Sequence, residues 1–173
     1  MKLIYSSLIF ILILGGCSSS TLHEAIQKTD RENVKILVQD DSDNIVVFLN
    51  EDYTGQPMMS LNTFSEKNGS YSYNFNGEYS KNVDLKGKYE FVRASQVGNS
   101  SNSVIWGGIF NYPDADIVTY SLSDEKGNTL YESSVGLNEE NIVFQQLPHN
   151  IYEKSEEFHY KVLNNECNVI IEW

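Results

Sequence analysis

The chain has 173 residues, with 12 lysine and arginine residues against 24 aspartate and glutamate residues, 3 prolines and 2 cysteines. Its length fits one domain or two small lobes, and a hydrophobic content of 40% excludes a wholly disordered chain. A formal net charge of -12 argues against a nucleic-acid partner, because neutralising phosphates requires clustered lysine and arginine. Two cysteines exclude a disulfide-rich scaffold.

The N-terminal segment carries the most specific motif of the chain. Lys2 precedes a largely apolar run over residues 3–14. This run has the length of the hydrophobic region of a signal peptide and is shorter than the roughly 20 residues that span a bilayer. It ends in Leu14-Gly15-Gly16-Cys17, which is a large apolar residue, two small residues and a cysteine. The motif and its position resemble the lipobox of bacterial lipoproteins.

The lipobox resemblance implies a cleaved and lipidated N-terminus. Residues 1–16 would be the signal peptide, removed after Gly16, and Cys17 would carry a diacylglyceryl group on its sulfur. Residues 17–21 are then expected to be a lipidated tether that holds the body on the extracytoplasmic face of the cell membrane. Acyl chains contribute about 0.8 kcal/mol per buried CH₂, so two chains give a firm anchor. The alternative is an ordinary signal peptide, or an uncleaved anchor, in which Cys17 is incidental.

Residues 22–85 are expected to form a helix packed on an antiparallel meander. Thr21 and Glu24 have the spacing of a capping box, which predicts a short helix from Leu22 to about Asp30. Period-two patterns and turn signals then indicate strands at 34–38, 45–49, 56–64 and 70–76. The segment 45–49 is continuously apolar, which predicts a strand covered on both faces.

Residues 86–173 are expected to form an immunoglobulin-like β-sandwich half. The polar segments 78–88 and 97–103 are predicted to be linkers or long loops, with a lobe boundary near residue 85. The predicted strands of this half are 89–94, 104–110, 117–123, 129–135, 141–147, 157–163 and 168–173. The chain lacks the Cys…Trp…Cys spacing of true immunoglobulin domains. The predicted fold class is therefore α+β and mostly β, with a short N-terminal helix on an antiparallel meander before the immunoglobulin-like half.

This order of elements also resembles small exported proteins of Gram-positive spore formers. The resemblance covers most of the chain after Cys17 and lies in the helix, the Val-Val-Phe run at 46–48 and the β half with its glycine turns. It implies an exported location and this architecture, and it implies no activity.

Tyr71, Tyr73 and Phe75 form the candidate ligand face. They alternate with small polar residues, which places three rings on one face of a strand. Exposed rings in a row could stack on a sugar or clamp a peptide, whereas the same rings could fill the core beneath the helix. Both interpretations stay open at the level of sequence.

The sequence shows no assembled catalytic or metal motif. Asp41 and Asp43 begin like a Ca²⁺ loop, but apolar residues follow where an EF-hand needs a ligand and a glycine. His23, His149 and His159 are far apart in the sequence, and the Gly-x-Ser-x-Gly elbow of serine hydrolases is missing. We therefore expect no metal, no cofactor and no catalytic residue.

The leading hypothesis is a monomeric, lipid-anchored extracytoplasmic protein that acts by binding or as an accessory protein of the cell envelope, without nucleic acid. The first alternative is an envelope hydrolase that cleaves glycan or peptide with a pair of carboxylates. The second alternative is a carbohydrate or peptide binder that uses the face formed by Tyr71, Tyr73 and Phe75.

The second cysteine, Cys167, is predicted to lie in the core. It shares one face of the predicted C-terminal strand with Val169, Ile171 and Trp173, so its sulfur is expected to behave as a small buried hydrophobe. A structural disulfide is not expected, because lipid would occupy Cys17.

Overall fold

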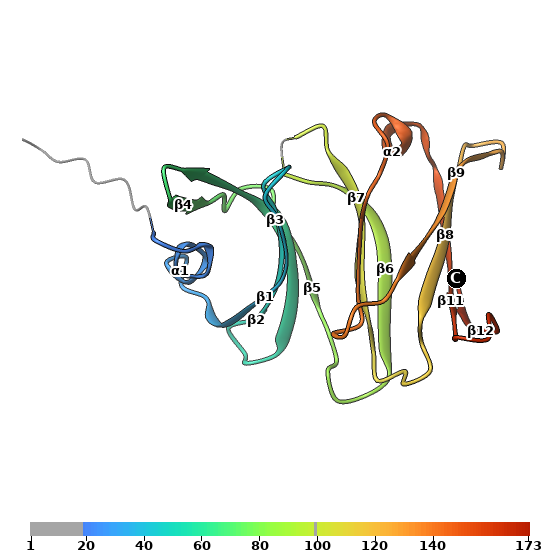
Figure 1. The fold of residues 1–173 in the computed structure, drawn as a ribbon, viewed down its shortest axis with the longest axis horizontal. Coiled ribbons are helices and arrows are strands. Elements are labelled where there is room, and N and C mark those ends of the chain that lie inside the picture. Colours follow the sequence, from blue (N-terminus) through green and yellow to red (C-terminus); the bar gives the residue numbers. More distant parts are fainter. Residues whose placement is uncertain (1–18, 99) are drawn as a thin grey trace, which may run out of the picture.

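The computed structural model of the protein describes residues 19–98 and 100–173, which form three antiparallel sheets arranged one behind another (Figure 1). The predicted cleavage and lipidation residues, Gly16 and Cys17, lie outside the described residues. The first part of the chain forms α1 (Leu22–Gln27), β1 (Glu32–Asp40), β2 (Ile45–Glu51), β3 (Pro57–Lys67), β4 (Ser70–Tyr73) and β5 (Tyr79–Asn82). The second part forms β6 (Tyr89–Gln96), β7 (Ser103–Phe110), β8 (Ile117–Ser123), β9 (Thr129–Gly136), β10 (Ile142–Gln146), α2 (Ile151–Lys154), β11 (Glu157–Leu163) and β12 (Val169–Glu172). A mostly β, α+β fold with antiparallel sheets is thus confirmed.

Helix α1 begins where the capping box predicts. The Thr21 hydroxyl accepts a hydrogen bond from the Glu24 backbone N–H at 3.2 Å. The helix ends at Gln27, earlier than predicted, because Asp30 adopts a left-handed conformation and turns the chain into β1. The side chains that it buries against the first sheet are Leu22, Ala25 and Ile26.

The first sheet has the order β1-β2-β3-β4, and β5 also pairs with β3. The first half of β3 pairs with β5 and its second half pairs with β4. The prediction of a linker over 78–88 is wrong at β5, whose four residues are all exposed. These residues lack an alternating pattern and are held as a strand by their pairing with β3.

Strand β2 is covered on both faces, as its continuous apolar run predicts. Val46 and Phe48 face the cluster beneath α1, which also contains Leu22 and Ile26. Ile45 and Val47 face the opposite way, into the core shared with the middle sheet.

The middle sheet, β10-β7-β6, supplies the most deeply buried strand, β7. Gly107 in this strand has φ +156°, and a Cβ added there would lie 2.0 Å from the carbonyl oxygen of Phe91 on β6. Only glycine permits this close approach of two backbones. The neighbouring Trp106 is buried, and its Nε1–H donates to Ser95 Oγ at 2.9 Å.

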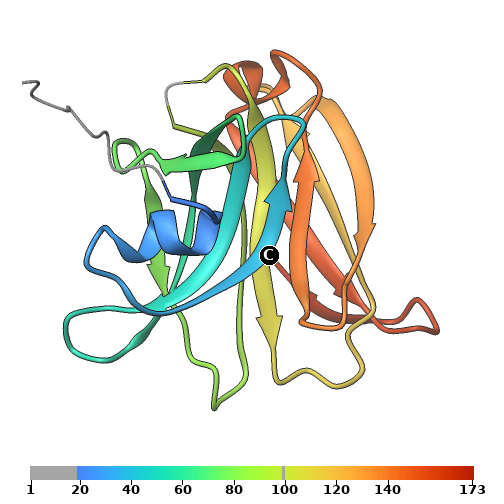
Figure 2. The ribbon, with the colours of Figure 1, turned by 60° about the vertical axis from the view of Figure 1, so that its left-hand side comes forward.

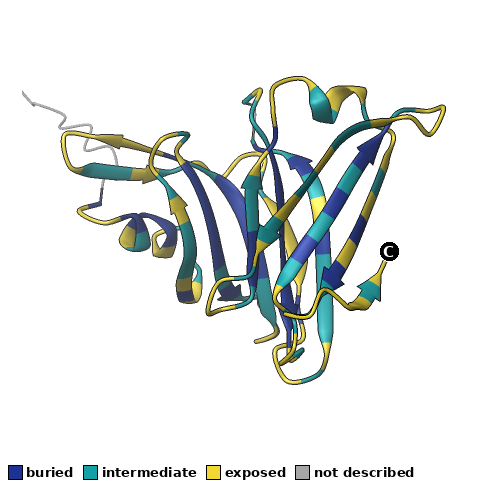
Figure 3. Cartoon of the chain, turned by 45° about the vertical axis from the view of Figure 1, so that its right-hand side comes forward, coloured by how far each residue is buried: buried dark blue, intermediate teal, exposed yellow. Residues whose placement is uncertain are grey.

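The outer sheet, β12-β11-β8-β9, faces the other side of the middle sheet, so the middle sheet is buried between two layers (Figures 2 and 3). The core between the first and middle sheets joins Ile45 and Val83 to Trp106 and Phe110. Side chains from both sides of residue 85 therefore share one core. The short helix α2, which the sequence did not predict, closes one end of the two later sheets.

The prediction that Cys167 is buried is wrong. Cys167 is exposed and lies in the β11–β12 turn with φ 63°, and β12 begins only at Val169. The Asn164 side chain holds this turn by accepting hydrogen bonds from the backbone N–H groups of Glu166 and Asn168. Strand β12 is an edge strand, and Trp173 behind it is 65% exposed. The predicted common face is broken, because Cys167 lies in the turn and a bulge in β12 pairs Ile171 with Val162 but Val169 with Leu163, on opposite faces of the sheet.

Candidate functional site

The described residues begin at Ser19, two positions after Cys17, and Ser19 is already part of the fold. Ser19 is buried, and its backbone N–H donates to the Tyr71 carbonyl at 3.0 Å while its own carbonyl accepts from the Tyr71 N–H at 2.8 Å. The Ser20 N–H and hydroxyl both donate to the Glu24 carboxylate, at 3.1 and 2.8 Å. These hydrogen bonds lower the pKa of Glu24. Residues 19–21, which we expected to be part of a tether, are therefore part of the folded body.

The three residues of the candidate ligand face do not form one exposed row. Tyr71 and Tyr73 lie on β4, half-buried, and pack against the cluster beneath α1. Their rings contact Phe64 and Phe48, with centroids 6.0 and 5.7 Å apart. Phe75 lies beyond the end of β4 and is 62% exposed.

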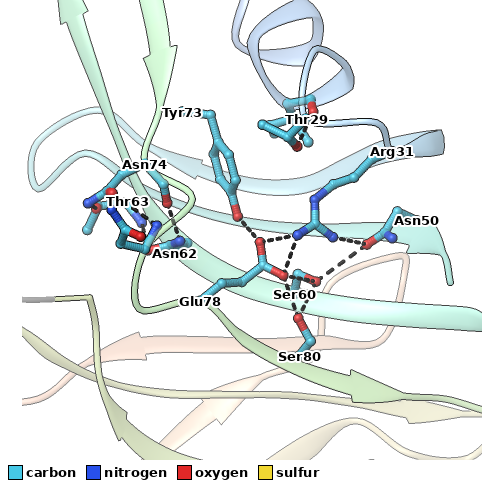
Figure 4. A network of polar contacts seen from close by, with 12 residues as sticks. Thr29, Arg31, Asn50, Ser60, Asn62, Thr63, Tyr73, Asn74, Glu78 and Ser80 are labelled. Carbon is cyan, nitrogen blue, oxygen red and sulfur yellow. Dashed lines mark hydrogen bonds and ion pairs between the residues drawn. The ribbon is translucent and has the colours of Figure 1, made fainter. Parts of the chain in front are cut away.

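Near Phe75, a network of polar side chains, most of them buried or partly buried, is centred on an ion pair (Figure 4). Arg31 Nη2 lies 2.7 Å from both carboxylate oxygens of Glu78, and the two side chains are 11% and 9% exposed. The guanidinium carbon is 5.5 Å from the ring centroid of Phe48 and 6.0 Å from that of Phe75. Further partners come from β2, β3, β4 and β5, namely Asn50, Ser60, Tyr73 and Ser80.

This network joins the loop after α1 to four strands of the first sheet. The Tyr73 hydroxyl donates to Glu78, and burial, followed by the charge of that carboxylate, raises the pKa of Tyr73. Sequence reasoning missed the pair, because Arg31 and Glu78 are 47 positions apart and no spacing rule relates them. The signal that could have drawn attention is Arg31 itself, one of two arginines in the chain.

The Arg31 side of the network borders an open hollow beside the β2–β3 turn. This hollow has a volume of about 490 Å³ and includes Asp30, Asp52 and Tyr53 in its wall. The Tyr53 side chain is fully exposed. The rim is acidic, so it would favour a cationic or polar ligand over an anionic one.

Asp52 shapes the β2–β3 turn. Its Oδ1 accepts from the Thr54 hydroxyl at 2.7 Å, from the Thr54 N–H at 2.8 Å and from the Gln56 N–H at 3.0 Å. These bonds, with the Thr54 hydroxyl contributing most, lower the pKa of Asp52 to about 2. A carboxyl held in its ionised form is suited to fixing a turn and unsuited to donating a proton near neutral pH.

The turn that begins like a Ca²⁺ loop is held by amide side chains. Asn102 Nδ2 donates to Asp43 Oδ1 at 2.7 Å, and Gln146 Nε2 donates to Asp40 Oδ2 at 2.6 Å. Asp41 is exposed and accepts from Gln39. Within residues 19–98 and 100–173, no three His, Cys, Asp or Glu side chains are placed to hold a metal ion.

The histidines are on separate elements. His23 contacts the Val34 carbonyl oxygen at 3.0 Å through Nε2, and His149 lies exposed in the loop before α2. His159 is exposed on β11, with Nε2 3.6 Å from the Glu157 carboxylate. None of these arrangements brings a histidine to a serine or cysteine nucleophile among the described residues.

Comparisons with protein-family models, with curated proteins and with solved structures found no match to this chain. Among the residues that the structure describes, no helix is both long and apolar enough to cross a membrane.

Proposed function

We propose that the protein is a lipid-anchored protein of the extracytoplasmic face of the cell membrane and that it acts by binding. The observation that carries the proposal is Leu14-Gly15-Gly16-Cys17 placed directly after an apolar run of signal-peptide length. An acidic body gains no attraction from an anionic membrane surface, so acyl chains on Cys17 would supply the attachment.

The carboxyl groups whose pKa is shifted support binding over catalysis. A general acid that works near neutral pH needs a raised carboxyl pKa. The four carboxyl groups with a shifted pKa, at Glu24, Asp52, Asp84 and Asp124, are all lowered by hydrogen bonds. An envelope hydrolase with a carboxylate pair is the alternative, and the acidic hollow beside Asp52, which Asp30 and Glu51 also line, is the candidate location for such a pair.

We also propose that residues 86–173 have an immunoglobulin-like arrangement. Naming the seven strands A to G in chain order puts A, B and E in the middle sheet and C, F and G in the outer sheet, which supports the proposal. The fourth strand, β9, lies beside the third strand instead of the fifth, and this departs from the constant-type immunoglobulin order.

Replacing the lipobox cysteine tests the anchor. Cys17→Ala removes the thiol that would be acylated, so we expect the full-length protein to move from the detergent phase to the aqueous phase in Triton X-114 partitioning. Intact mass spectrometry should show the loss of the diacylglyceryl group. Cys167→Ala is the matched control and should keep both properties. Unchanged partitioning of Cys17→Ala would contradict the proposal.

The purified protein also distinguishes binding from hydrolysis. When it is incubated with cell-wall glycans or peptides, we expect saturable retention of a ligand whose mass stays unchanged. Release of shorter fragments that stops in Asp52→Asn would favour the hydrolase instead.

A further inference from the structure

The distance between the lipobox cysteine and the folded body limits how the body can lie on a membrane. One residue separates Cys17 from Ser19, and consecutive Cα atoms are about 3.8 Å apart, so the two Cα atoms are at most roughly 7.6 Å apart. Ser19 is fixed by two backbone hydrogen bonds to Tyr71 and is 4% exposed. An acylated Cys17 would thus hold β4 close to the lipid headgroups.

The residues after Ser19 are also held in the fold, so they do not lengthen the link between Cys17 and the folded body. Ser20 is bonded to Glu24, and Thr21 caps α1. Helix α1 in turn buries Leu22 and Ile26 against the first sheet. Moving the body away from the membrane would therefore require breaking the start of the fold.

Ser19, which pairs with Tyr71 on β4, lies at one end of the long axis of the molecule (Figure 1). Figure 1 has that axis horizontal, with α1 and β4 at one end and β8, β9, β11 and β12 at the other. Figure 2 shows the same separation from another side. A bilayer plane that approaches Ser19 without cutting through the body must lie against the end that carries α1 and β4.

The surface at this end is polar. The tip of the β3–β4 hairpin exposes Ser65, Glu66, Lys67 and Asn68. Such side chains suit the hydrated headgroup layer and are costly in the hydrocarbon interior. The tip of the β3–β4 hairpin is therefore suited to contact with the headgroups, and only the acyl chains on Cys17 would enter the hydrocarbon interior.

From this geometry we propose that the α1 and β3–β4 end of the protein rests on the lipid headgroups of the membrane and that the β12-β11-β8-β9 sheet points away from it. The proposal rests on the proposed lipidation of Cys17. It implies that ligands approach from the outer sheet or from the sides, and that the β3–β4 hairpin is shielded by the bilayer.

Two matched cysteine variants test the orientation. In the full-length Cys167→Ser protein, Lys67→Cys marks the β3–β4 hairpin and Lys126→Cys marks the β8–β9 turn, and both sites are exposed lysines. Each thiol is coupled to a small fluorophore, and the protein is reconstituted in phosphatidylcholine vesicles that contain lipid with a nitroxide on its headgroup. We expect several-fold stronger quenching at position 67 than at position 126.

A spacer variant shows whether the short connection causes the orientation. About ten Gly and Ser residues inserted between Ser18 and Ser19 have a root-mean-square span of roughly 17 Å, which should release the body and reduce quenching at position 67. Equal quenching at both positions in a protein that carries the lipid by mass spectrometry would overturn the orientation alone. A protein without lipid, in which Cys17 also takes up the fluorophore, would overturn both the orientation and the proposed anchor.

Discussion

At the scale of single residues, the Arg31–Glu78 pair is the most consequential contact in the first sheet. Both side chains are about nine-tenths removed from water, and the Arg31 guanidinium lies within 6.0 Å of the ring centroids of Phe48 and Phe75. A buried ion pair is weak evidence of net stabilisation, but the loss of one partner leaves an uncompensated buried charge. The pair therefore fixes the conformation of the loop between α1 and β1.

Glu78→Gln tests this role. The substitution keeps the shape of the side chain and removes its charge, so Arg31 loses its counter-ion, and we expect a loss of about 3 kcal/mol in the free energy of unfolding. Chemical denaturation measures the change. Glu172→Gln is the control, because Glu172 pairs with Lys161 at 2.8 Å where both side chains are about half exposed. That control should cost less than about 1 kcal/mol, and an equal cost at the two sites would contradict the argument.

Asp52 provides a pH-dependent contribution to stability. Its hydrogen bonds lower its pKa from 3.8 to about 2, so the folded protein binds a proton there less readily than the unfolded chain. Its contribution is present above the unfolded pKa and is lost as the pH falls from about 4 to about 2.

We therefore expect the difference in melting temperature between the wild type and Asp52→Asn to be constant above about pH 5 and to shrink between about pH 4 and pH 2. Thermal unfolding followed by circular dichroism at each pH measures it. Asp114→Asn, at an exposed loop carboxyl, is the control for the loss of one surface charge. A difference in melting temperature that increased as the pH fell would show that Asp52 is not stabilised in its ionised form.

At the scale of elements, strands that carry their own signals are predictable. The run at 45–49 and the turn at 124–128 mark β2 and the β8–β9 hairpin through composition alone. Strand β5 has no such signal, because it exists through pairing with β3. Cys167 shows the complementary limit: a period-two pattern does not reveal that Cys167 belongs to a turn or that a bulge interrupts β12.

Strand β7 depends on one glycine that composition alone would not single out. Gly107→Ala places a methyl group against the Phe91 carbonyl, so β6 and β7 must separate, and we expect a loss of about 3 kcal/mol or more in the free energy of unfolding. Gly136→Ala, at a strand end with open space around it, is the control and should change stability little. Denaturant titration of both variants gives the comparison. Equal denaturation midpoints for Gly107→Ala and Gly136→Ala would mean that the backbones of β6 and β7 can separate at low cost in free energy.

At the scale of the whole molecule, the sequence indicated the fold class but not the stacking of the sheets. Each strand's residues specify two faces, whereas the choice of neighbour depends on contacts between distant segments. Ile45 and Trp106 meet in one core although they are 61 positions apart in the chain. The aromatic residues could be located from the sequence, and the predicted lipobox stays a prediction because it lies outside the described residues. The separation of Phe75 from Tyr71 and Tyr73, and the Arg31–Glu78 network, required the fold.

If Cys17 is lipidated as proposed, the pairing of Ser19 with Tyr71 also determines how easily a protease could release the protein from the cell. Proteases that shed surface proteins cut exposed and unstructured stretches of chain. With lipid on Cys17, Ser18 alone would separate the anchor from residues that are hydrogen-bonded in the fold. No stalk is then available for a cut that frees an intact body, so turnover would follow that of the membrane, and soluble forms would be degradation fragments.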